Sequence, residues 1–171
     1  MTRARDNADL GDSYGTLGSG VVFPAGHVIT AESNGANTTV NSNASYHTTY
    51  ATCDITIKKA DSKILILSSA QFFRGSAGAD IDAKLAYKAS TGRSATWGDY
   101  TVIIEFEAVG GMGGTVGNFY CQPFLCYLWT HGQSAGTLVN VACGVQAVSG
   151  QLYNNSATNS RSQMTVLEIQ Q

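Results

Sequence analysis

The chain has 171 residues, of which 13% are charged and 43% hydrophobic, and its formal net charge is -2 at pH 7. That length suits one domain with a sizeable core. The balance of charge leaves no cluster of Lys and Arg to hold phosphate groups, so nucleic acid is not an expected partner. The sequence also lacks a run of about 18 apolar residues, which excludes a transmembrane helix and membrane insertion by one.

Residues 1–20 are polar and rich in turn-forming residues, with Leu10 and Leu17 as the only sizeable aliphatic side chains. Such a segment cannot bury enough surface to fold alone. We expect it to be an extended arm that attaches the domain to a neighbour or to a larger object, a free tail being the alternative. No apolar stretch follows the basic start of the chain, so we expect assembly in a cytoplasm and no secretory signal.

One domain is expected over residues 21–171, and it begins with an apolar run at 21–29. Pro24 and Gly26 interrupt this run, as is typical of an edge strand with a bend. The next segment, 32–45, is polar, and its Asn34-Gly35 pair is a strong turn signal. This segment is therefore predicted to be a loop.

The stretch from Cys53 to Phe73 is predicted to be a central hairpin with its turn at 59–62. Its first strand alternates, so that Cys53, Ile55 and Ile57 share the face toward the core. Its second strand is apolar at every position from 64 to 67. That pattern indicates a strand buried on both faces, with the second face against another subunit.

Four further segments alternate with a period of two, namely 80–89, 100–109, 138–148 and 163–169. In the second of these, Val102, Ile104 and Phe106 are predicted to point inward. In the third, the small Ala142 and Gly144 lie on the face away from the core and would allow another backbone to approach closely.

Residues 119–129, FYCQPFLCYLW, are the most aromatic segment, and both faces of such a strand need a cover that a neighbouring subunit would supply. In total the sequence predicts about eight strands separated by loops rich in Gly, Ser and Asn, with no sustained helical period. Strands at this spacing are typical of an all-β antiparallel sandwich or jelly roll.

The sequence contains no recognisable catalytic or metal-binding pattern. Its three histidines, His27, His47 and His131, lack the local context of a nucleophile elbow, a zinc-binding helix or a Cys-His pair. Enzyme activity, a cofactor and a metal site are therefore not expected. The four cysteines lie within apolar alternating runs and are predicted to be buried core thiols: Cys53, Cys121, Cys126 and Cys143.

Aromatic and planar polar residues at loop edges are the candidate binding residues. They are Arg93, Trp97, Tyr100, Trp129 and His131. A ring face can cover the apolar surface of a sugar while Arg satisfies its hydroxyl groups, so a host-surface glycan is the expected ligand and a protein interface the next candidate. The alternative is that both tryptophans lie in the core or at a subunit interface.

Three pieces of the chain carry a family resemblance. They are GTLGSGVVFPAGHVI at 15–29, DSKILI at 61–66 and MTVLEI at 164–169. Together, and in this order, they resemble a module of bacteriophage virion proteins, the C-terminal head of tail fibres. The resemblance spans most of residues 15–171 and implies a jelly roll similar to those of the tumour-necrosis-factor and complement-C1q type, which associate as trimers. A long shaft normally precedes such a head, whereas here only the short arm does.

We therefore expect a non-enzymatic, homotrimeric structural protein of a phage virion. Its partners would be copies of itself and, through residues 1–20, other virion proteins. The first hypothesis is the knob of a fibre or short appendage that binds a host-surface receptor or glycan. The second is a capsid decoration protein that stabilises the head lattice, which a free-standing knob starting at Met1 would suit, and the third is a glycan-cleaving enzyme.

Overall fold

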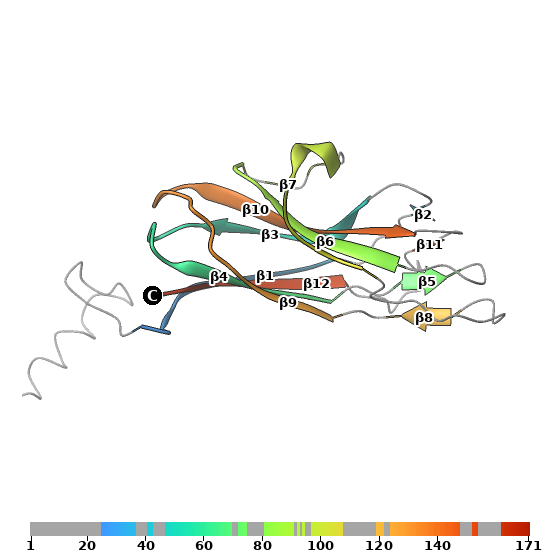
Figure 1. Ribbon diagram of the computed structural model, residues 1–171, viewed down its shortest axis with the longest axis horizontal. Helices are drawn as coiled ribbons and strands as arrows, with labels where there is room; N and C mark the ends of the chain where they lie inside the picture. Colours follow the sequence, from blue (N-terminus) through green and yellow to red (C-terminus); the bar gives the residue numbers. More distant parts are fainter. Residues whose placement is uncertain are drawn as a thin grey trace, which may run out of the picture.

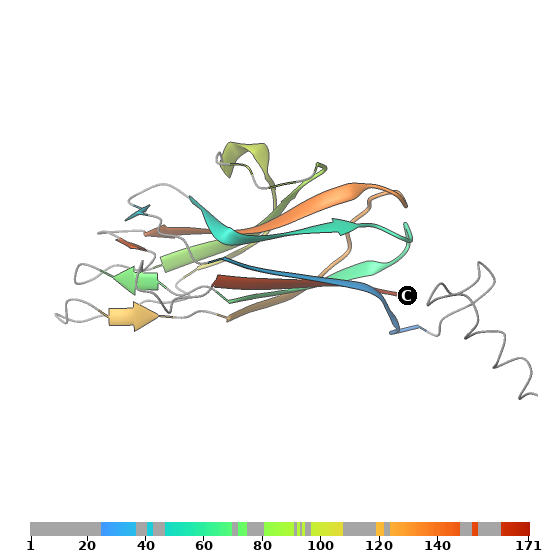
Figure 2. The ribbon, with the colours of Figure 1, turned by 180° about the vertical axis from the view of Figure 1, so that it is seen from behind.

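The computed structural model describes residues 25–36, 41–42, 47–69, 72–74, 81–90, 92, 94, 97–107, 119–121, 124–147, 152–153 and 162–171. Two four-stranded antiparallel sheets pack face to face (Figures 1 and 2). In the lower sheet of Figure 1 the order is β1 (Val28–Ala36), β12 (Ser162–Ile169), β4 (Lys63–Ser69), β9 (Phe124–Trp129). In the upper sheet it is β3 (His47–Thr56), β10 (Leu138–Ala147), β6 (Ile81–Lys88), β7 (Thr101–Phe106).

The path of the chain through these eight strands is that of a jelly roll. Each strand is followed by one in the opposite sheet, except that β6 and β7 are neighbours in the upper sheet. In each sheet, the first and last strands of the chain thus pair with each other, β1 with β12 and β3 with β10, and the last strand also pairs with one from the middle, which is the double Greek-key order. The predicted all-β jelly-roll sandwich of about eight long strands is confirmed.

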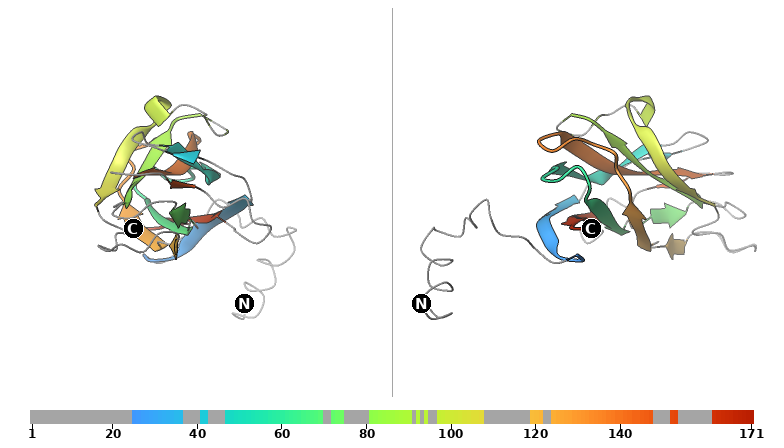
Figure 3. Two further views of the ribbon diagram at one scale, coloured as in Figure 1. Left: turned by 90° about the vertical axis from the view of Figure 1, so that its right-hand side faces the viewer. Right: turned by 60° about the vertical axis from the view of Figure 1, so that its left-hand side comes forward.

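The two ends of the sandwich differ. At one end, which we call the far end, four short strands form a third sheet in the order β2 (Asn41–Ser42), β11 (Leu152–Tyr153), β5 (Phe72–Arg74), β8 (Phe119–Cys121). At the other, the terminal end, lie the start of β1, the C-terminus and the connections 57–62 and 130–137 (Figures 1 and 3). Here the amide of Gln170 donates to the His27 carbonyl at 2.8 Å.

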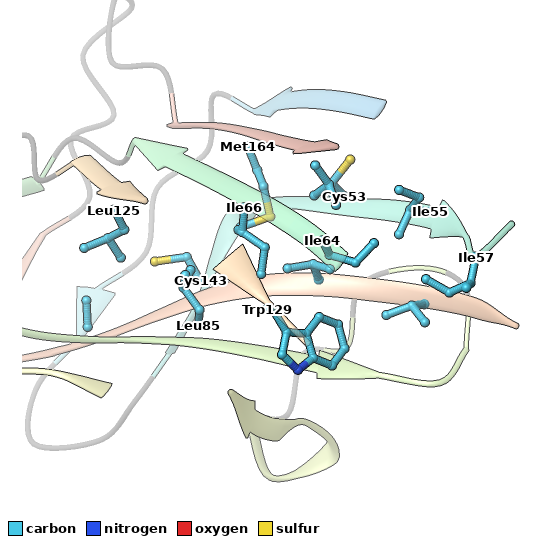
Figure 4. Packing of buried hydrophobic residues seen from close by; sticks show 14 of the residues in the cluster. Cys53, Ile55, Ile57, Ile64, Ile66, Leu85, Leu125, Trp129, Cys143 and Met164 are labelled. Atoms are coloured by element: carbon cyan, nitrogen blue, oxygen red, sulfur yellow. The ribbon is translucent and has the colours of Figure 1, made fainter. Parts of the chain in front are cut away.

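The core lies between the two large sheets and follows the alternation that the sequence predicts (Figure 4). From the upper sheet, Cys53 and Ile55 are buried, and from the lower sheet Ile64 and Ile66 are fully buried. Burial of one aliphatic side chain of this size contributes about 1.5–3 kcal/mol. The inward face predicted for β3 is therefore confirmed, whereas the sequence of β4, apolar throughout, predicts burial on both faces and not which of them is inward.

The predicted hairpin from Cys53 to Phe73 is wrong. β3 pairs with β10, whereas β4 pairs with β12 and β9, so the two strands belong to different sheets. Residues 57–62 are a crossing between sheets, which pack about 10 Å apart, and not a turn between paired strands. The alternation of a strand reveals its inward face but not the identity of its neighbours.

The turn predicted at Asn34-Gly35 is also wrong, because β1 continues through both residues. Gly35 pairs with Gln163 of β12, and Nδ2 of Asn34 donates to the carbonyl oxygen of Thr52 at 2.8 Å. This bond ties β1 to β3 across the side of the sandwich, and such tertiary contacts override local turn preferences. β1 is an edge strand, since among the described strands it pairs with β12 alone, but it begins at Val28 and so shares only residues 28 and 29 with the edge strand predicted over 21–29.

In β7, the prediction that Val102 points inward is wrong. The pairing of β6 with β7 shifts by one residue between Leu85 and Ala86, so that Leu85 faces Ile104 whereas Ala86 faces Val102. A bulge of this kind moves the side chains on one side of it to the opposite face. Val102 is accordingly 46% exposed, while Ile104 packs against the core.

The aromatic segment 119–129 forms two strands, β8 in the small sheet and β9 in the lower sheet. The predicted arm 1–20 and Pro24 lie outside the described residues. Within the described part of the chain, no helix has the length and apolarity needed to span a membrane.

Candidate functional site

The outer face of the upper sheet is covered by the chain itself. Tyr100 packs on Ala86 and Ala142, and Trp97 lies beside them, stacked on Tyr100 with ring centroids 5.5 Å apart. A Cβ atom added to Gly144 would lie 2.4 Å from the Trp97 ring, so the glycine provides the space for the indole. The close approach predicted at Ala142 and Gly144 is thus made by aromatic side chains of the same chain and not by another backbone.

Polar contacts fix this cover in place. The hydroxyl of Tyr100 donates to Oδ1 of Asn140 at 2.7 Å, and Nδ2 of Asn140 donates to Oδ1 of Asp54 at 2.6 Å. Asp54 in turn accepts from the amide of Gly92 with both carboxyl oxygens, each at 3.1 Å. Because Asn140 is buried and satisfied at both ends of its side chain, the segment after β6 is held on the sheet.

The rest of the same face is charged. Nζ of Lys84 lies 2.9 Å from Oε1 of Glu105, and Nζ of Lys88 lies 5.7 Å from the centroid of the Tyr100 ring. Asp54 on β3 and Asp82 on β6 add two carboxylates, opposite Asn140 and Gln146 of β10 respectively. Such a face needs no further cover, since its apolar patch is small and already packed.

The outer face of the lower sheet is different, and we call it the apolar face. It consists of the outward residues of four strands: Val28, Ala31, Ser33 and Gly35 of β1; Gln163, Thr165, Leu167 and Ile169 of β12; Lys63, Leu65, Leu67 and Ser69 of β4; Phe124, Cys126 and Leu128 of β9. Lys63 is the one charged residue in this described set, and it lies at the terminal end.

Large apolar side chains follow one another across the apolar face. Leu167 pairs with Leu65, and Leu65 pairs with Leu128, so three leucines form one row across β12, β4 and β9. Leu128 is 45% exposed and Phe124 65% exposed, which is unusual for two large hydrophobic residues on the same strand. The outward side of β4, which belongs to the apolar face, is thus uncovered in a single chain, although the inward side of the same strand is fully buried.

The cysteines divide between the core and the apolar face. Burial raises the pKa of the Cys53 thiol to about 11 and that of the Cys143 thiol to about 12. Cys126, by contrast, is exposed on the apolar face, so its prediction as a core thiol is wrong. The side chain of Cys121 lies outside the described residues.

A buried polar network closes the terminal end, and we call it the Glu168 network. Where the chain crosses from β3 to β4, Lys58 and Lys59 lie beyond the end of β3, so their backbone amides do not pair within the upper sheet. They donate to the carboxyl group of Glu168 at 2.8–3.0 Å. The hydroxyl of Ser62 donates to Oε1 of the same group at 2.6 Å. Glu168 is fully buried, yet both its oxygens are satisfied, as a buried carboxylate requires.

His131 completes this network from the second crossing, which leads from β9 to β10. Its Nε2 lies 3.1 Å from Oγ of Ser62, and its Nδ1 accepts from the amide of Gln133 at 2.9 Å. The ring is 4% exposed and meets the edge of Trp129. Burial lowers the pKa of His131, while the charge of Glu168 acts in the opposite direction.

The structure does not gather the five predicted binding residues into one site. Trp97 is half-buried over Gly144, and Tyr100 is buried beneath it. Trp129 belongs to the core, 4.5 Å between ring centroids from Tyr87, and His131 lies in the Glu168 network. Arg93 lies outside the described residues. A glycan-binding role for this set stays a prediction.

Sequence reasoning missed Glu168 and Asn140 as residues that organise the structure. The signal for Glu168 was present, because it continues the inward row of Met164 and Val166 on the last strand. A carboxylate in such a row predicts buried donors opposite it. Asn140 likewise stands in an apolar strand, but nothing in the local sequence indicates that Tyr100 is its partner.

No protein-family model and no curated protein matches the chain. Among solved structures, the chain is similar to Eiger TNF from S. frugiperda, with 9% identity, a TM-score of 0.44 and coverage of 83% of this chain and 93% of that chain. It is also similar to VP2 of infectious bursal disease virus, with 13% identity and a TM-score of 0.45 over 91% of this chain. This chain spans 36% of the length of VP2.

Proposed function

We propose that the protein is a non-enzymatic structural subunit of a phage virion that works as a homotrimer. The observation that carries this proposal is the apolar face of the lower sheet. In contrast to the upper sheet, its large side chains have no cover among the described residues. A structural subunit that is always assembled with copies of itself would bury this face throughout its life.

The size of the apolar face supports an obligate partner. Four strands about 4.8 Å apart, each of about seven residues at about 3.3 Å per residue, span roughly 19 by 23 Å, or about 440 Å² in projection. Exposed apolar patches of that size on single chains are often binding surfaces. Because such a patch favours aggregation whenever it is open, the partner must be present as soon as the chain folds, and a second copy of the chain meets that condition.

The nearly uncharged character of the face favours the same partner. A charged ligand, such as an acidic polysaccharide or nucleic acid, would find Lys63 as its single cation there. Copies of an apolar face can bury one another without leaving charges unpaired. The trimeric number rests on the resemblance of the motifs at 15–29, 61–66 and 164–169 to trimeric fibre heads.

The location of both ends of the domain on one side of the sandwich supports display on a particle. The start of β1 and the C-terminus share the terminal end, so residues 1–20 would attach from that side to other virion proteins. The far end, with its third sheet, then points outward as a knob and is the surface offered to a host receptor or glycan. A decoration protein on the head would be oriented in the same way, with its terminal end attached and its far end outward. Antibody labelling of intact particles distinguishes a position on the tail from one on the head.

The test of assembly compares two residues of nearly equal exposure on opposite faces. Leu128 on the apolar face is 45% exposed and Val102 on the upper sheet is 46% exposed. Neither is buried in the single chain, so Leu128→Glu and Val102→Glu should both fold. We expect light scattering after gel filtration to give three times the 18.0 kDa chain mass for the wild type and Val102→Glu, and the monomer mass for Leu128→Glu.

Alkylation of Cys126 gives a second measurement without any substitution. The thiol lies on the apolar face, so it should be protected in the native assembly and react in the Leu128→Glu monomer. Cys53 and Cys143 stay protected in both, since they are buried in the core. A monomeric wild type, or a Leu128→Glu variant that remains a trimer with Cys126 protected, would contradict the proposed interface.

A further inference from the structure

The terminal end of the sandwich is closed by two crossings that hold each other. The crossing from β3 to β4 offers the amides of Lys58 and Lys59 to Glu168 of β12. The crossing from β9 to β10 is bonded to the end of β3, because the amide of Ile57 donates to the carbonyl of Thr137 at 2.9 Å and the amide of Gly136 donates to the carbonyl of Ile57 at 2.7 Å. Ser62 and His131 join the two crossings side chain to side chain.

The directions of the two hydrogen bonds of the His131 ring are determined. The amide of Gln133 can only donate, so Nδ1 of His131 is an acceptor and carries no proton. The neutral ring therefore has its proton on Nε2, from which it donates to Oγ of Ser62. The single proton of Ser62 then faces two acceptors, Oε1 of Glu168 at 2.6 Å and the carbonyl oxygen of Lys59 at 2.7 Å. When the His131 ring is neutral and its proton is on Nε2, every donor in this set of hydrogen bonds has an acceptor.

A second proton on His131 breaks this arrangement. Nδ1 would become a donor that faces the Gln133 amide, another donor, at the present distance of 2.9 Å. The imidazolium would also be buried, at 4% exposure, beside the edge of the Trp129 ring. Both effects favour rotation of the ring into water, which releases Ser62 and the segment after Trp129.

The charges around His131 are few. Glu168 of β12 faces it through Ser62, and its charge would stabilise the protonated ring, as would the hydrogen bond with the backbone of Ser62. From the first crossing, Lys58 and Asp61 are exposed and Lys59 is partly exposed, so water screens their side chains. From β6, the Tyr87 hydroxyl reaches the region by accepting from Nε2 of Gln133 at 3.5 Å.

We infer that His131, Ser62 and Glu168 form a proton-sensitive latch that keeps the terminal end closed in neutral solution and opens it in mild acid. The opening is local, because the hydrophobic cluster between the sheets includes none of these three residues. It loosens the connection 130–137 and the end of β3, next to the end of the molecule that holds Gln170 against the start of β1.

The pH range follows from the direction of the shift. Burial lowers the pKa of His131 below its ordinary value of 6.5. The latch is therefore at full strength above pH 6.5, and its contribution is lost as the pH falls through the lower pKa of the folded state. Between pH 6.5 and that lower pKa, each pH unit favours the open form by up to about tenfold, and below it both forms carry the proton, so the ratio no longer changes.

Nuclear magnetic resonance of the wild-type protein tests the inference. The nitrogen shifts of His131 should report the Nε2-H tautomer at neutral pH and a titration below 6.5. Amide exchange, expressed as protection relative to the free peptide, should fall by up to about tenfold per pH unit at Gln133, Gly136 and Ile57 between pH 6.5 and the midpoint of that titration, and should level off below it. Core amides such as those of Ile66 and Val141 should keep their protection over the same range.

Two variants separate the latch from general effects of acid. In His131→Gln the side chain can still donate to Ser62 but cannot titrate, so protection at Gly136 and Ile57 should no longer depend on pH in this range. His27→Gln removes an exposed histidine at the same end and should behave as the wild type. Loss of core and latch protection together, an Nδ1-H tautomer, or unchanged pH dependence in His131→Gln would each overturn the latch.

Discussion

Replacing Glu168 by Gln tests whether one buried carboxylate holds the terminal end together. Oε1 accepts from Ser62, Lys59 and Lys58, whereas Oε2 accepts from Lys58 alone at 2.9 Å. A glutamine oxygen at the Oε1 position keeps three contacts, but its amino group then faces the Lys58 amide, donor against donor. Hydrogen bonds to a charged acceptor contribute about 1 kcal/mol more than neutral ones, so loss of the charge over three bonds costs about 3 kcal/mol.

The assay is urea unfolding followed by circular dichroism, at one fixed protomer concentration because assembly adds to the apparent stability. The matched control is Glu105→Gln, which removes the charge of an exposed carboxylate paired with Lys84 and should change the free energy of unfolding by no more than about 1 kcal/mol. If Glu168→Gln loses no more stability than Glu105→Gln, the carboxylate does not have the buried role that its contacts assign to it.

Two further predictions concern the upper cover and the core. Gly144→Ala should destabilise the fold by about 1–3 kcal/mol, because the added Cβ would overlap the Trp97 ring. The same change in a Trp97→Ala background should cost clearly less. If the two costs were additive in this double-mutant cycle, the ring would not lie over Gly144. Ile66→Asp should yield no soluble folded protein, since an unpaired buried carboxylate costs several kcal/mol. The control Ile66→Val should fold with a loss of about 0.5–1.5 kcal/mol. An Ile66→Asp variant that behaves like the wild type in gel filtration and circular dichroism would contradict the burial of this residue.

The strands themselves could be predicted from sequence because alternation records burial directly. At the end of β3 the pattern assigns Cys53, Ile55 and Ile57 to the inward face, and the structure buries all three. In β4 every residue from 64 to 67 is apolar, so the pattern does not indicate which face is inward. What alternation cannot record is which strand lies alongside. For this reason the same residues suggested a hairpin, although β3 and β4 lie in opposite sheets. The bulge that exposes Val102 likewise depends on its partner strand and leaves no local signal.

The candidate site was less predictable, because the exposure of an aromatic residue depends on what the fold places beneath it. Trp129 and Tyr100 stand next to loops in the sequence, which suggested surface positions. Trp129 is nevertheless buried against Tyr87, which is 42 positions away from it, and Tyr100 is buried because β10 offers it a shallow surface at Ala142. Glu168 could have been found, since a carboxylate in an apolar row requires donors, but its donors are backbone amides that any sequence would supply.

Two apolar strands with similar patterns lead to different conclusions once the size of their outward residues is compared. On β10 the outward residues Ala142 and Gly144 are small, and a Trp from the same chain fills the space above them. On β4 the outward residues Leu65 and Leu67 are large, and no described segment of the chain lies on them. A small outward residue leaves room for a cover from within, whereas a large one already fills that room and gains stability only from a second surface. The size of the outward residues, and not their hydrophobicity alone, therefore distinguishes the face that the chain closes itself from the face that we propose it shares with its copies.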